Sequence, residues 1–171
     1  MTDQRTPIRR VLVVCTHNRT RSVMAGGLLW KYLRDNPSFV IETAGFDEPG
    51  KPAIPEALQL LAEHGVDASA HRSKQVTPEL VRSSALVLTA ERQHVMRIVT
   101  DLGGNFDATF TLPEFATYAM TGGDRPTGLA YLRADIPEVE DPTGRTHGVW
   151  QSVWRDLDGW CQTTAAALRH R

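Results

Sequence analysis

The stretch "VVCTHNRTRS", residues 13–22, places a thiol, two guanidinium groups and several hydroxyls directly after an apolar run. Cys15 ends that run, and Arg21 and Ser22 follow it six and seven residues later. A cysteine thiolate is a nucleophile, and an arginine presents a planar fork of donors that can bind two oxygens of one anion. Cys15 also fits a packed residue at a strand end, because a free cysteine behaves as a small hydrophobe.

The chemistry that these residue types favour is attack of a thiolate on a phosphate ester. If the loop after Cys15 leads straight into a helix, backbone N–H groups and the helix dipole converge on one point and bind a tetrahedral oxyanion. Lowering a thiol pKa from about 8.5 to about 6 requires roughly 3.4 kcal/mol, of which a helix terminus supplies about 1 to 2 kcal/mol. The remainder must come from the loop amides, the Ser22 hydroxyl and Arg21.

A leaving alkoxide or phenoxide also needs a proton, and "EVEDPTG", residues 138–144, is the best source of an acid. Asp141 precedes Pro142, which favours an extended conformation in a loop before the last helix. Near a thiolate and a dianionic ester the pKa of Asp141 is expected to rise, so that its protonated carboxyl acts as general acid. Alternatively Asp141 only forms a turn before the proline, and Glu138 and Glu140 are the substitute acids.

Alternating strands and helices are expected to position these groups. The β-branched run "RVLVVC", residues 10–15, is typical of a strand that is buried on both faces. The pattern continues with helices over 22–35, 54–65 and 91–103 and strands over 38–45, 85–90 and 107–112. Such alternation requires right-handed crossovers and a parallel sheet. We therefore predict an α/β fold, a single three-layer domain over residues 1–171 with a doubly wound, four-stranded parallel sheet.

The remaining segments carry no expected chemistry. Residues 113–135 break the rhythm with several glycines and Pro126, which predicts an irregular insertion, a loop or a helix pair, near the general-acid loop. The last segment has an apolar face of a long closing helix, formed by Trp150, Trp154, Leu157, Cys161 and Leu168. The tryptophans on this face, and Cys161 as an inert thiol, are expected to belong to the core.

Composition limits the classes of function. The 171 residues, 41% of them hydrophobic, suffice for one well-buried domain, and the net charge of −1 gives no global reason to expect nucleic acid or a membrane as partner. Two cysteines form neither a disulfide framework nor a zinc site, which favours a cytoplasmic protein without metal or cofactor. The opening "MTDQRTPIRR" leads into only five apolar residues, so neither a signal peptide nor a transmembrane helix is expected.

A cysteine, five residues and Arg-Ser after the first strand, with Asp-Pro before the last helix, resemble the low-molecular-weight protein tyrosine phosphatase family. The likeness covers most of residues 10–112 and again 135–168, and "ETAG", "GVDASAHRSKQVTPEL" and "ALVLTAERQH" occur in the family's order. The resemblance implies a phosphatase-like domain with Cys15 as nucleophile, Arg21 as phosphate clamp and Asp141 as general acid. It further implies loop support or phosphate binding by Thr16, His17, Asn18, Arg19, Thr20, Ser22 and His71.

Within that resemblance, Asn18 and Ser22 hold the loop and stabilise the thiolate, and His71 forms a hydrogen bond to the loop or is an ordinary surface histidine. The chain also departs from the family. It has His17 where relatives have glycine, and Thr20 where many have a second cysteine, which removes the partner of a protective disulfide. Thr143 replaces an aromatic residue, which leaves open the presence of a wall that stacks on phosphotyrosine. Arg19 either contacts an acidic substrate or is solvated.

The predicted function is hydrolysis of phosphate monoesters, foremost protein phosphotyrosine, through a cysteinyl-phosphate intermediate. The partner is then a phosphorylated protein or a small phosphate ester, and phosphate-like oxyanions inhibit. The first alternative is an arsenate reductase that uses a small-molecule thiol, because "CTHN" resembles the loop of such enzymes with the same fold. The second is a non-catalytic phosphate-binding module, although binding alone needs neither a thiolate nor an acid. Phosphotyrosine, phosphoarginine, a small ester and arsenate all remain open as substrates.

Overall fold

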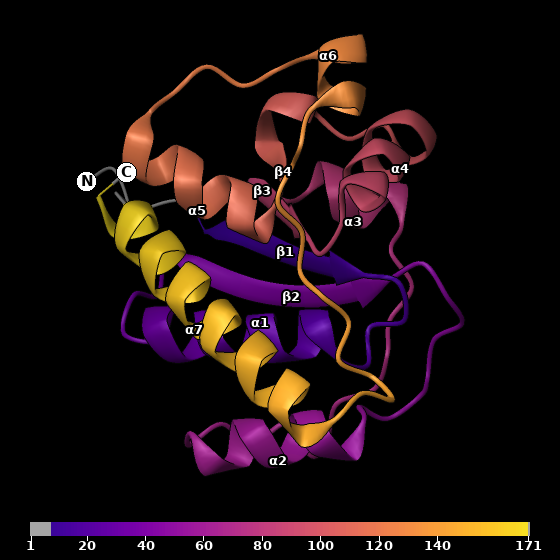
Figure 1. Ribbon diagram of the computed structural model, residues 1–171, viewed down its shortest axis with the longest axis vertical. Helices are drawn as coiled ribbons and strands as arrows, with labels where there is room; N and C mark the ends of the chain where they lie inside the picture. Colours follow the sequence, from indigo (N-terminus) through magenta and orange to yellow (C-terminus); the bar gives the residue numbers. More distant parts are fainter. Residues whose placement is uncertain (1–7, 171) are drawn as a thin grey trace, which may run out of the picture.

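The computed structural model describes residues 8–170 and contains a four-stranded parallel sheet between two layers of helices (Figure 1). The strand order is β2-β1-β3-β4, with every neighbouring pair parallel. The strands are β1 (Arg9–Cys15), β2 (Phe39–Gly45), β3 (Leu86–Thr89) and β4 (Thr109–Thr111). The predicted α/β fold with a doubly wound, four-stranded parallel sheet is confirmed. The expectation for the N-terminal residues falls, over residues 1–7, outside the described part of the chain.

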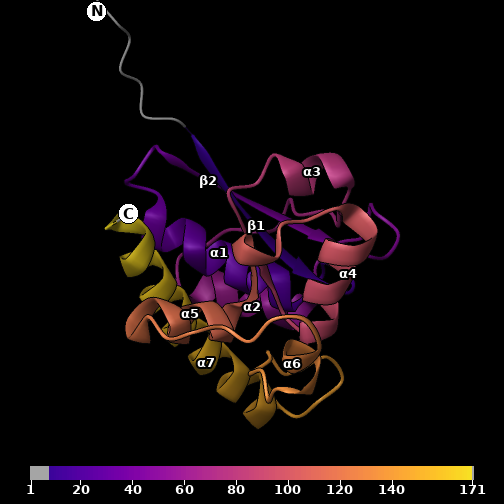
Figure 2. The same ribbon diagram turned by 90° about the horizontal axis from the view of Figure 1, so that it is seen from above.

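Helices cover both faces of the sheet, α3 and α4 on one side and α1, α5 and α7 on the other (Figure 2). Side chains alternate along β1, so that Val11 and Val13 pack into the α1 layer and Leu12 and Val14 into the α4 layer. The helices are α1 (Arg21–Leu33), α2 (Pro55–Glu63), α3 (Pro78–Arg82), α4 (Arg92–Leu102), α5 (Leu112–Thr121), α6 (Gly128–Arg133), α7 (His147–Arg169) and the 3-10 turn η1 (Phe106–Ala108).

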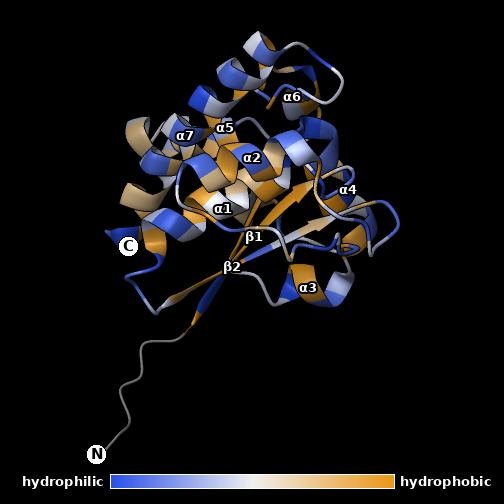
Figure 3. Cartoon of the chain, turned by 90° about the horizontal axis from the view of Figure 1, so that it is seen from below, coloured by the Kyte–Doolittle hydropathy of each residue, from blue (hydrophilic) through white to orange (hydrophobic). Residues whose placement is uncertain are grey.

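Figure 3 shows β1 as largely hydrophobic, whereas the helices mix hydrophobic and hydrophilic residues along their length. This difference follows from burial, because a central strand is covered on both faces and a helix on the surface of the domain on only one.

Most of the segment 113–135 is helical, which agrees with the helix-pair alternative and not with an irregular loop. Helix α5 begins with a capping box in which Glu114 N donates to Thr111 Oγ1 at 3.2 Å and Thr111 N donates to Glu114 Oε2 at 3.0 Å. It ends at Gly122, whose positive φ of 60° is the left-handed conformation common at helix ends. Arg125 then holds the segment through a 2.6 Å ion pair with Glu114 that is almost fully buried.

The closing helix α7 has the predicted apolar face, and its two tryptophans Trp150 and Trp154 are each 4% exposed. Cys161 lies on the same face, where its Sγ donates to the Ala25 carbonyl oxygen at 3.6 Å. Burial raises the pKa of the Cys161 thiol far above its usual range, so it stays protonated. No helix of residues 8–170, α7 included, is long and apolar enough to cross a membrane.

Candidate active site

The Cys15 loop, residues 15–22, connects the carboxyl end of β1 to α1 at the centre of the sheet. From β1 the chain passes through α1 to β2 on one side, whereas β3 lies on the other side, so the loop stands at a topological switch point. The first hydrogen bond of α1 runs from Met24 N to Thr20 O at 2.9 Å. The N–H groups of residues 21–23 therefore lack an acceptor within the helix and favour an anion in the loop.

A short chain of hydrogen bonds leads to the sulfur of Cys15. Asn18 Nδ2 donates to Ser22 Oγ at 2.9 Å, and Ser22 Oγ lies 3.0 Å from Cys15 Sγ. Because the Ser22 oxygen already accepts a hydrogen bond from the Asn18 amide, its own hydroxyl proton is free to point at the sulfur. All three side chains are buried. A hydroxyl that donates to sulfur stabilises the thiolate relative to the thiol.

Asn18 is the residue that fixes the curvature of the loop. Its φ of 53° is left-handed, a conformation in which asparagine is enriched among residues other than glycine. The backbone N of Lys74 donates to Asn18 Oδ1 at 2.9 Å, and His71 Nε2 lies 2.8 Å from the Asn18 carbonyl oxygen. Since a carbonyl only accepts, His71 must carry its proton on Nε2. Burial lowers the pKa of His71, which favours this neutral form.

Gly45, the last residue of β2, lets the Cys15 loop approach the sheet. A Cβ atom at this position would lie 2.7 Å from Asn18 N and 2.8 Å from Thr16 O. Both are backbone atoms, which cannot move aside without changing the shape of the loop. The glycine of "ETAG" is thus required by close packing against the loop.

Arg21 is 5% exposed and joins the loop to two neighbouring segments. Its Nη1 donates to Glu91 Oε1 at 2.5 Å and to the Val139 carbonyl oxygen at 3.1 Å, while Nη2 lies 3.7 Å from Asp141 Oδ2. Burial alone would raise the pKa of Glu91, but hydrogen bonds from Arg21 and Gln93 hold that pKa below its usual value. Glu91 is therefore a carboxylate that orients the guanidinium.

Of the three candidate acids, the structure places Asp141 beside Arg21. Glu138 accepts a hydrogen bond from the backbone N of Arg92 at 2.8 Å, at the start of α4, and Glu140 forms a 3.3 Å ion pair with Arg145. The side chain of Asp141 is 41% exposed, so a ligand can reach it.

Thr143, the residue that departs from the family pattern, connects the acid loop to the Cys15 loop. Its backbone N donates to Asp141 Oδ1 at 3.0 Å, and its hydroxyl lies 3.1 Å from the Thr20 hydroxyl. The segment between α6 and α7 (Figure 1) also passes the end of β3, where Val139 N donates to Ala90 O at 2.8 Å. These bonds hold Asp141 beside the Cys15 loop.

His17 and Arg19 lie at the rim of the site. His17 Nδ1 forms a hydrogen bond with the Asp47 carboxylate, and both side chains are about half exposed. Arg19 Nε donates to the Pro52 carbonyl oxygen at 2.7 Å. Both residues therefore bind the segment after β2, and Arg19 is not simply solvated.

Three further residues near the site were not singled out from the sequence, namely Gly45, Glu91 and His94. Glu91 and His94 follow the third predicted strand, and the carboxyl ends of neighbouring parallel strands meet at one edge of the sheet. That rule could have drawn attention to both residues. Gly45 follows the same rule at the end of the second strand, but its role depends on distances that no sequence pattern contains.

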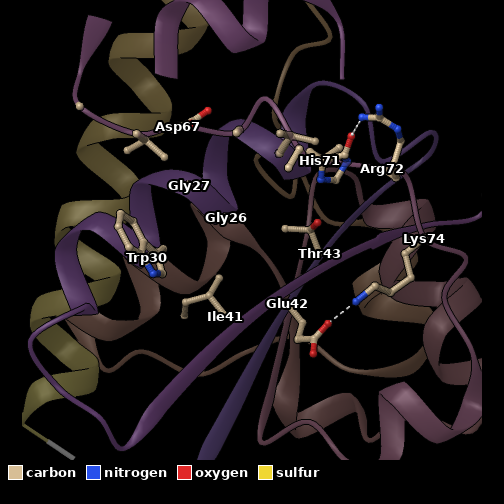
Figure 4. Close-up of a pocket in the computed structure, with 15 residues that line it drawn as sticks. Gly26, Gly27, Trp30, Ile41, Glu42, Thr43, Asp67, His71, Arg72 and Lys74 are labelled. Carbon is tan, nitrogen blue, oxygen red and sulfur yellow. Dashed lines mark hydrogen bonds and ion pairs between the residues drawn. The ribbon is translucent and has the colours of Figure 1, made fainter. Parts of the chain in front are cut away.

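A groove of about 640 Å³ lies between α1, β2 and residues 65–74, with Trp30 and His71 towards opposite ends (Figure 4). Lys74 Nζ lies 2.5 Å from Glu42 Oε2 at its margin. No residue of the Cys15 loop lines it, and His71 is its connection to that loop. Across residues 8–170 no cluster of three or more His, Cys, Asp or Glu side chains is arranged to hold a metal ion.

A flavodoxin-like strand order with a buried cysteine and arginine on a loop at the switch point defines a class of α/β proteins built to bind an oxyanion next to a thiol. A family model described as low molecular weight phosphotyrosine protein phosphatase matches residues 10–125. The chain belongs to this family and is a phosphatase. The matched range ends before Asp141, so the assignment of that residue depends on the geometry.

Individual relatives support the family. The chain is 34% identical over 128 residues to a probable low molecular weight protein-tyrosine-phosphatase, EpsP, of Ralstonia nicotianae, covering 74% of this chain and 86% of that one. It is 37% identical to a protein-arginine-phosphatase of Geobacillus stearothermophilus over 161 residues, which cover 94% of this chain and 96% of the relative. The solved structure of the arginine phosphatase YwlE from the same organism matches with a TM-score of 0.78 and 29% identity, over 95% of this chain and 94% of that one.

Proposed function

We propose that the protein hydrolyses phosphate monoesters of phosphorylated proteins through a covalent cysteinyl-phosphate. The observation that carries the proposal is the convergence on one loop of the Cys15 sulfur, 3.0 Å from a hydroxyl able to donate to it, and of Arg21, 3.7 Å from Asp141. A nucleophile, an anion clamp and an acid are the groups that phosphoryl transfer to a thiolate requires.

In the first step the Cys15 thiolate attacks phosphorus while the loop N–H groups and Arg21 bind the equatorial oxygens. The bond to the leaving oxygen breaks, and Asp141 gives that oxygen its proton. In the second step the Asp141 carboxylate removes a proton from water, and the resulting hydroxide displaces the sulfur. Inorganic phosphate and the thiolate are released, and Asp141 is protonated again. Phosphate-like oxyanions are expected to bind the same loop and inhibit.

The substrate favoured here is protein phosphotyrosine, in line with the description of the family. Phosphoarginine, in which the leaving atom is a guanidino nitrogen instead of an ester oxygen, is the second candidate. Two observations favour it: a relative that matches 94% of the chain is a protein-arginine-phosphatase, and the residue after Pro142 in the acid loop is Thr143 and not an aromatic residue. We further propose a reducing compartment such as the cytoplasm as the site of action, because Cys15 must remain a free thiol.

The test is a set of parallel assays on the purified protein with an aryl phosphate, a phosphotyrosine peptide, a phosphoarginine peptide, and arsenate with a small-molecule thiol. We expect hydrolysis that a chelator leaves unchanged, and a preference for one peptide that identifies the substrate. Cys15→Ser should abolish turnover and still bind vanadate, because the loop amides remain while the nucleophile becomes poor at neutral pH. Arsenate reduction without hydrolysis, or substantial turnover by Cys15→Ser, would overturn the proposal.

A further inference from the structure

His94, in the first turn of α4, is 1% exposed and is held at both ring nitrogens. The backbone N of Glu91 donates to His94 Nδ1 at 3.2 Å, and His94 Nε2 lies 2.9 Å from Thr16 Oγ1. Because Nδ1 accepts, the proton of the neutral ring must be on Nε2, and the ring donates to the threonine hydroxyl. Burial outweighs the opposing effect of the Glu91 charge and lowers the pKa of His94 to about 4, so this neutral form persists at neutral pH.

Thr16 is the residue directly after Cys15. Its carbonyl oxygen and its hydroxyl form hydrogen bonds to two different segments. Its carbonyl oxygen accepts from Phe46 N at 2.8 Å and from Asp47 N at 3.1 Å, while its hydroxyl contacts His94. The carbonyl bonds fix the backbone relative to the end of β2. The hydroxyl bond fixes the same residue relative to α4, on the other side of the loop.

Helix α4 also holds the other end of the Cys15 loop. Glu91, the residue before α4, binds the Arg21 guanidinium at 2.5 Å, and its backbone N–H is the donor to His94. Glu91 and His94 form a reciprocal capping box, in which the Glu91 carboxylate accepts from the backbone of His94. One turn of α4 therefore contacts the first residue after the nucleophile and the arginine that binds the anion.

The ring of His94 has little room to reorient. The Phe46 ring packs against it with centroids 5.4 Å apart, and the guanidinium of Arg97 covers Phe46 at 3.9 Å from its centroid. Phe46 follows β2 and Arg97 lies on α4, so the ring is enclosed by the same two segments that bind Thr16.

We propose that His94 is a positioning residue for the phosphatase reaction, acting through Thr16 and Glu91 to hold both ends of the Cys15 loop in its phosphate-binding shape. This inference rests on the function proposed above. His94 does not touch the reacting atoms, so its loss should affect the geometry of the loop rather than the chemistry of any single group. Anion affinity and turnover should fall together when His94 or Thr16 is changed.

The experiment is a double-mutant cycle with His94→Leu, Thr16→Val and the double variant, followed by aryl phosphate kinetics and by calorimetric titration with vanadate. We expect each single variant to lose about 10- to 100-fold in kcat/KM, with a parallel loss of vanadate affinity, because small displacements at a reacting centre are costly. The double variant should be no worse than the poorer single variant, since both remove the same contact.

Two matched controls and one rescue separate positioning from general packing. Thr164→Val changes a fully buried threonine on α7, and His64→Leu removes a histidine that contacts Trp154. Both controls should keep the activity of the wild type. His94→Gln retains an amide that can donate to Thr16, and it should recover most of the vanadate affinity and keep the fold if His94→Leu does not.

The outcomes distinguish this inference from the proposed function. If the wild type hydrolyses no phosphate ester, the proposed function fails. If the wild type is active and folded His94→Leu retains its kcat/KM and vanadate affinity within twofold, the positioning role alone is wrong. Losses that multiply in the double variant would show that His94 and Thr16 act independently, which also contradicts the inference.

Discussion

Among single residues, Asp141 has the role that depends most on the structure. Its carboxylate lies 3.7 Å from Arg21, whereas Glu138 and Glu140 are bound to Arg92 and Arg145. Asp141→Asn should slow esters with basic leaving groups by about 10²- to 10⁴-fold, because proton donation matters most for a poor leaving group. An activated aryl phosphate should lose much less. Kinetics across a graded series of leaving groups measure the difference.

The same variant should lose the alkaline limb of the pH profile of kcat/KM, because that limb reports the deprotonation of the general acid. Its acid limb, which depends on the thiolate or on ionisation of the substrate, should remain. An equal loss across all leaving groups would contradict the acid role and would mean that Asp141 only shapes the loop. Thr143, whose backbone N donates to Asp141 Oδ1 at 3.0 Å, would then be the next residue to change in order to test the shape of the loop.

The residues of the site differ in how far the sequence could reveal them. Cys15, Arg21 and Ser22 stand within one loop of eight positions, so their spacing alone suggested an anion site. Glu91 and His94 were not assigned a role, because their importance depends on contacts with residues about 70 and 78 positions away. Their position after the third predicted strand could have drawn attention to both residues, but long-range pairs leave no local periodicity from which their contacts could be predicted.

At the scale of elements, the junction of β2 with the Cys15 loop leaves no space for a side chain. In Gly45→Ala the new Cβ would lie 2.7 Å from the backbone N of Asn18, so the loop must shift. We expect a loss of more than about tenfold in kcat/KM, together with about 1 to 3 kcal/mol of stability. Aryl phosphate kinetics and urea unfolding measure the two effects.

Gly159→Ala is the matched control for that substitution. Gly159 lies inside α7, and a Cβ there would meet no atom within 4 Å. Alanine should stabilise the protein by about 0.5 to 1 kcal/mol through its higher helix propensity and should leave activity unchanged. If Gly45→Ala kept its kcat/KM and its stability as Gly159→Ala is expected to do, the close approach of the loop and the strand would not be needed for activity.

The elements themselves were predictable where their periodicity was long. The four strands and the helices α1, α2 and α4 lie within two residues of the predicted ranges at every end, and α7 has the predicted apolar face. Helix α3 has only 5 residues, too few for a periodic pattern. Helices α5 and α6 were obscured by the glycines between them, and their arrangement depends on the buried pair of Arg125 with Glu114.

For the molecule as a whole, buried neutral histidines make stability depend on pH. Burial lowers the pKa of His94 to about 4 and also lowers that of His71, whereas an unfolded histidine titrates near 6.5. Between these values the unfolded chain binds protons that the folded protein does not, so the free energy of unfolding must decrease as the pH falls. The stabilisation is fully present above about pH 6.5 and is lost progressively towards pH 4.

His94 alone should remove about 2 kcal/mol from the free energy of unfolding between pH 7.5 and pH 5, if its pKa is near 4 when folded and near 6.5 when unfolded. Urea unfolding at several pH values measures the slope for the wild type and for His94→Gln. The variant is expected to be less stable at pH 7.5 and to lose less of its remaining stability on acidification, because glutamine does not titrate. If the free energy of unfolding had the same pH dependence in the two proteins, other groups would cause that dependence. His94 would then accept a proton without disturbing the contact with Thr16.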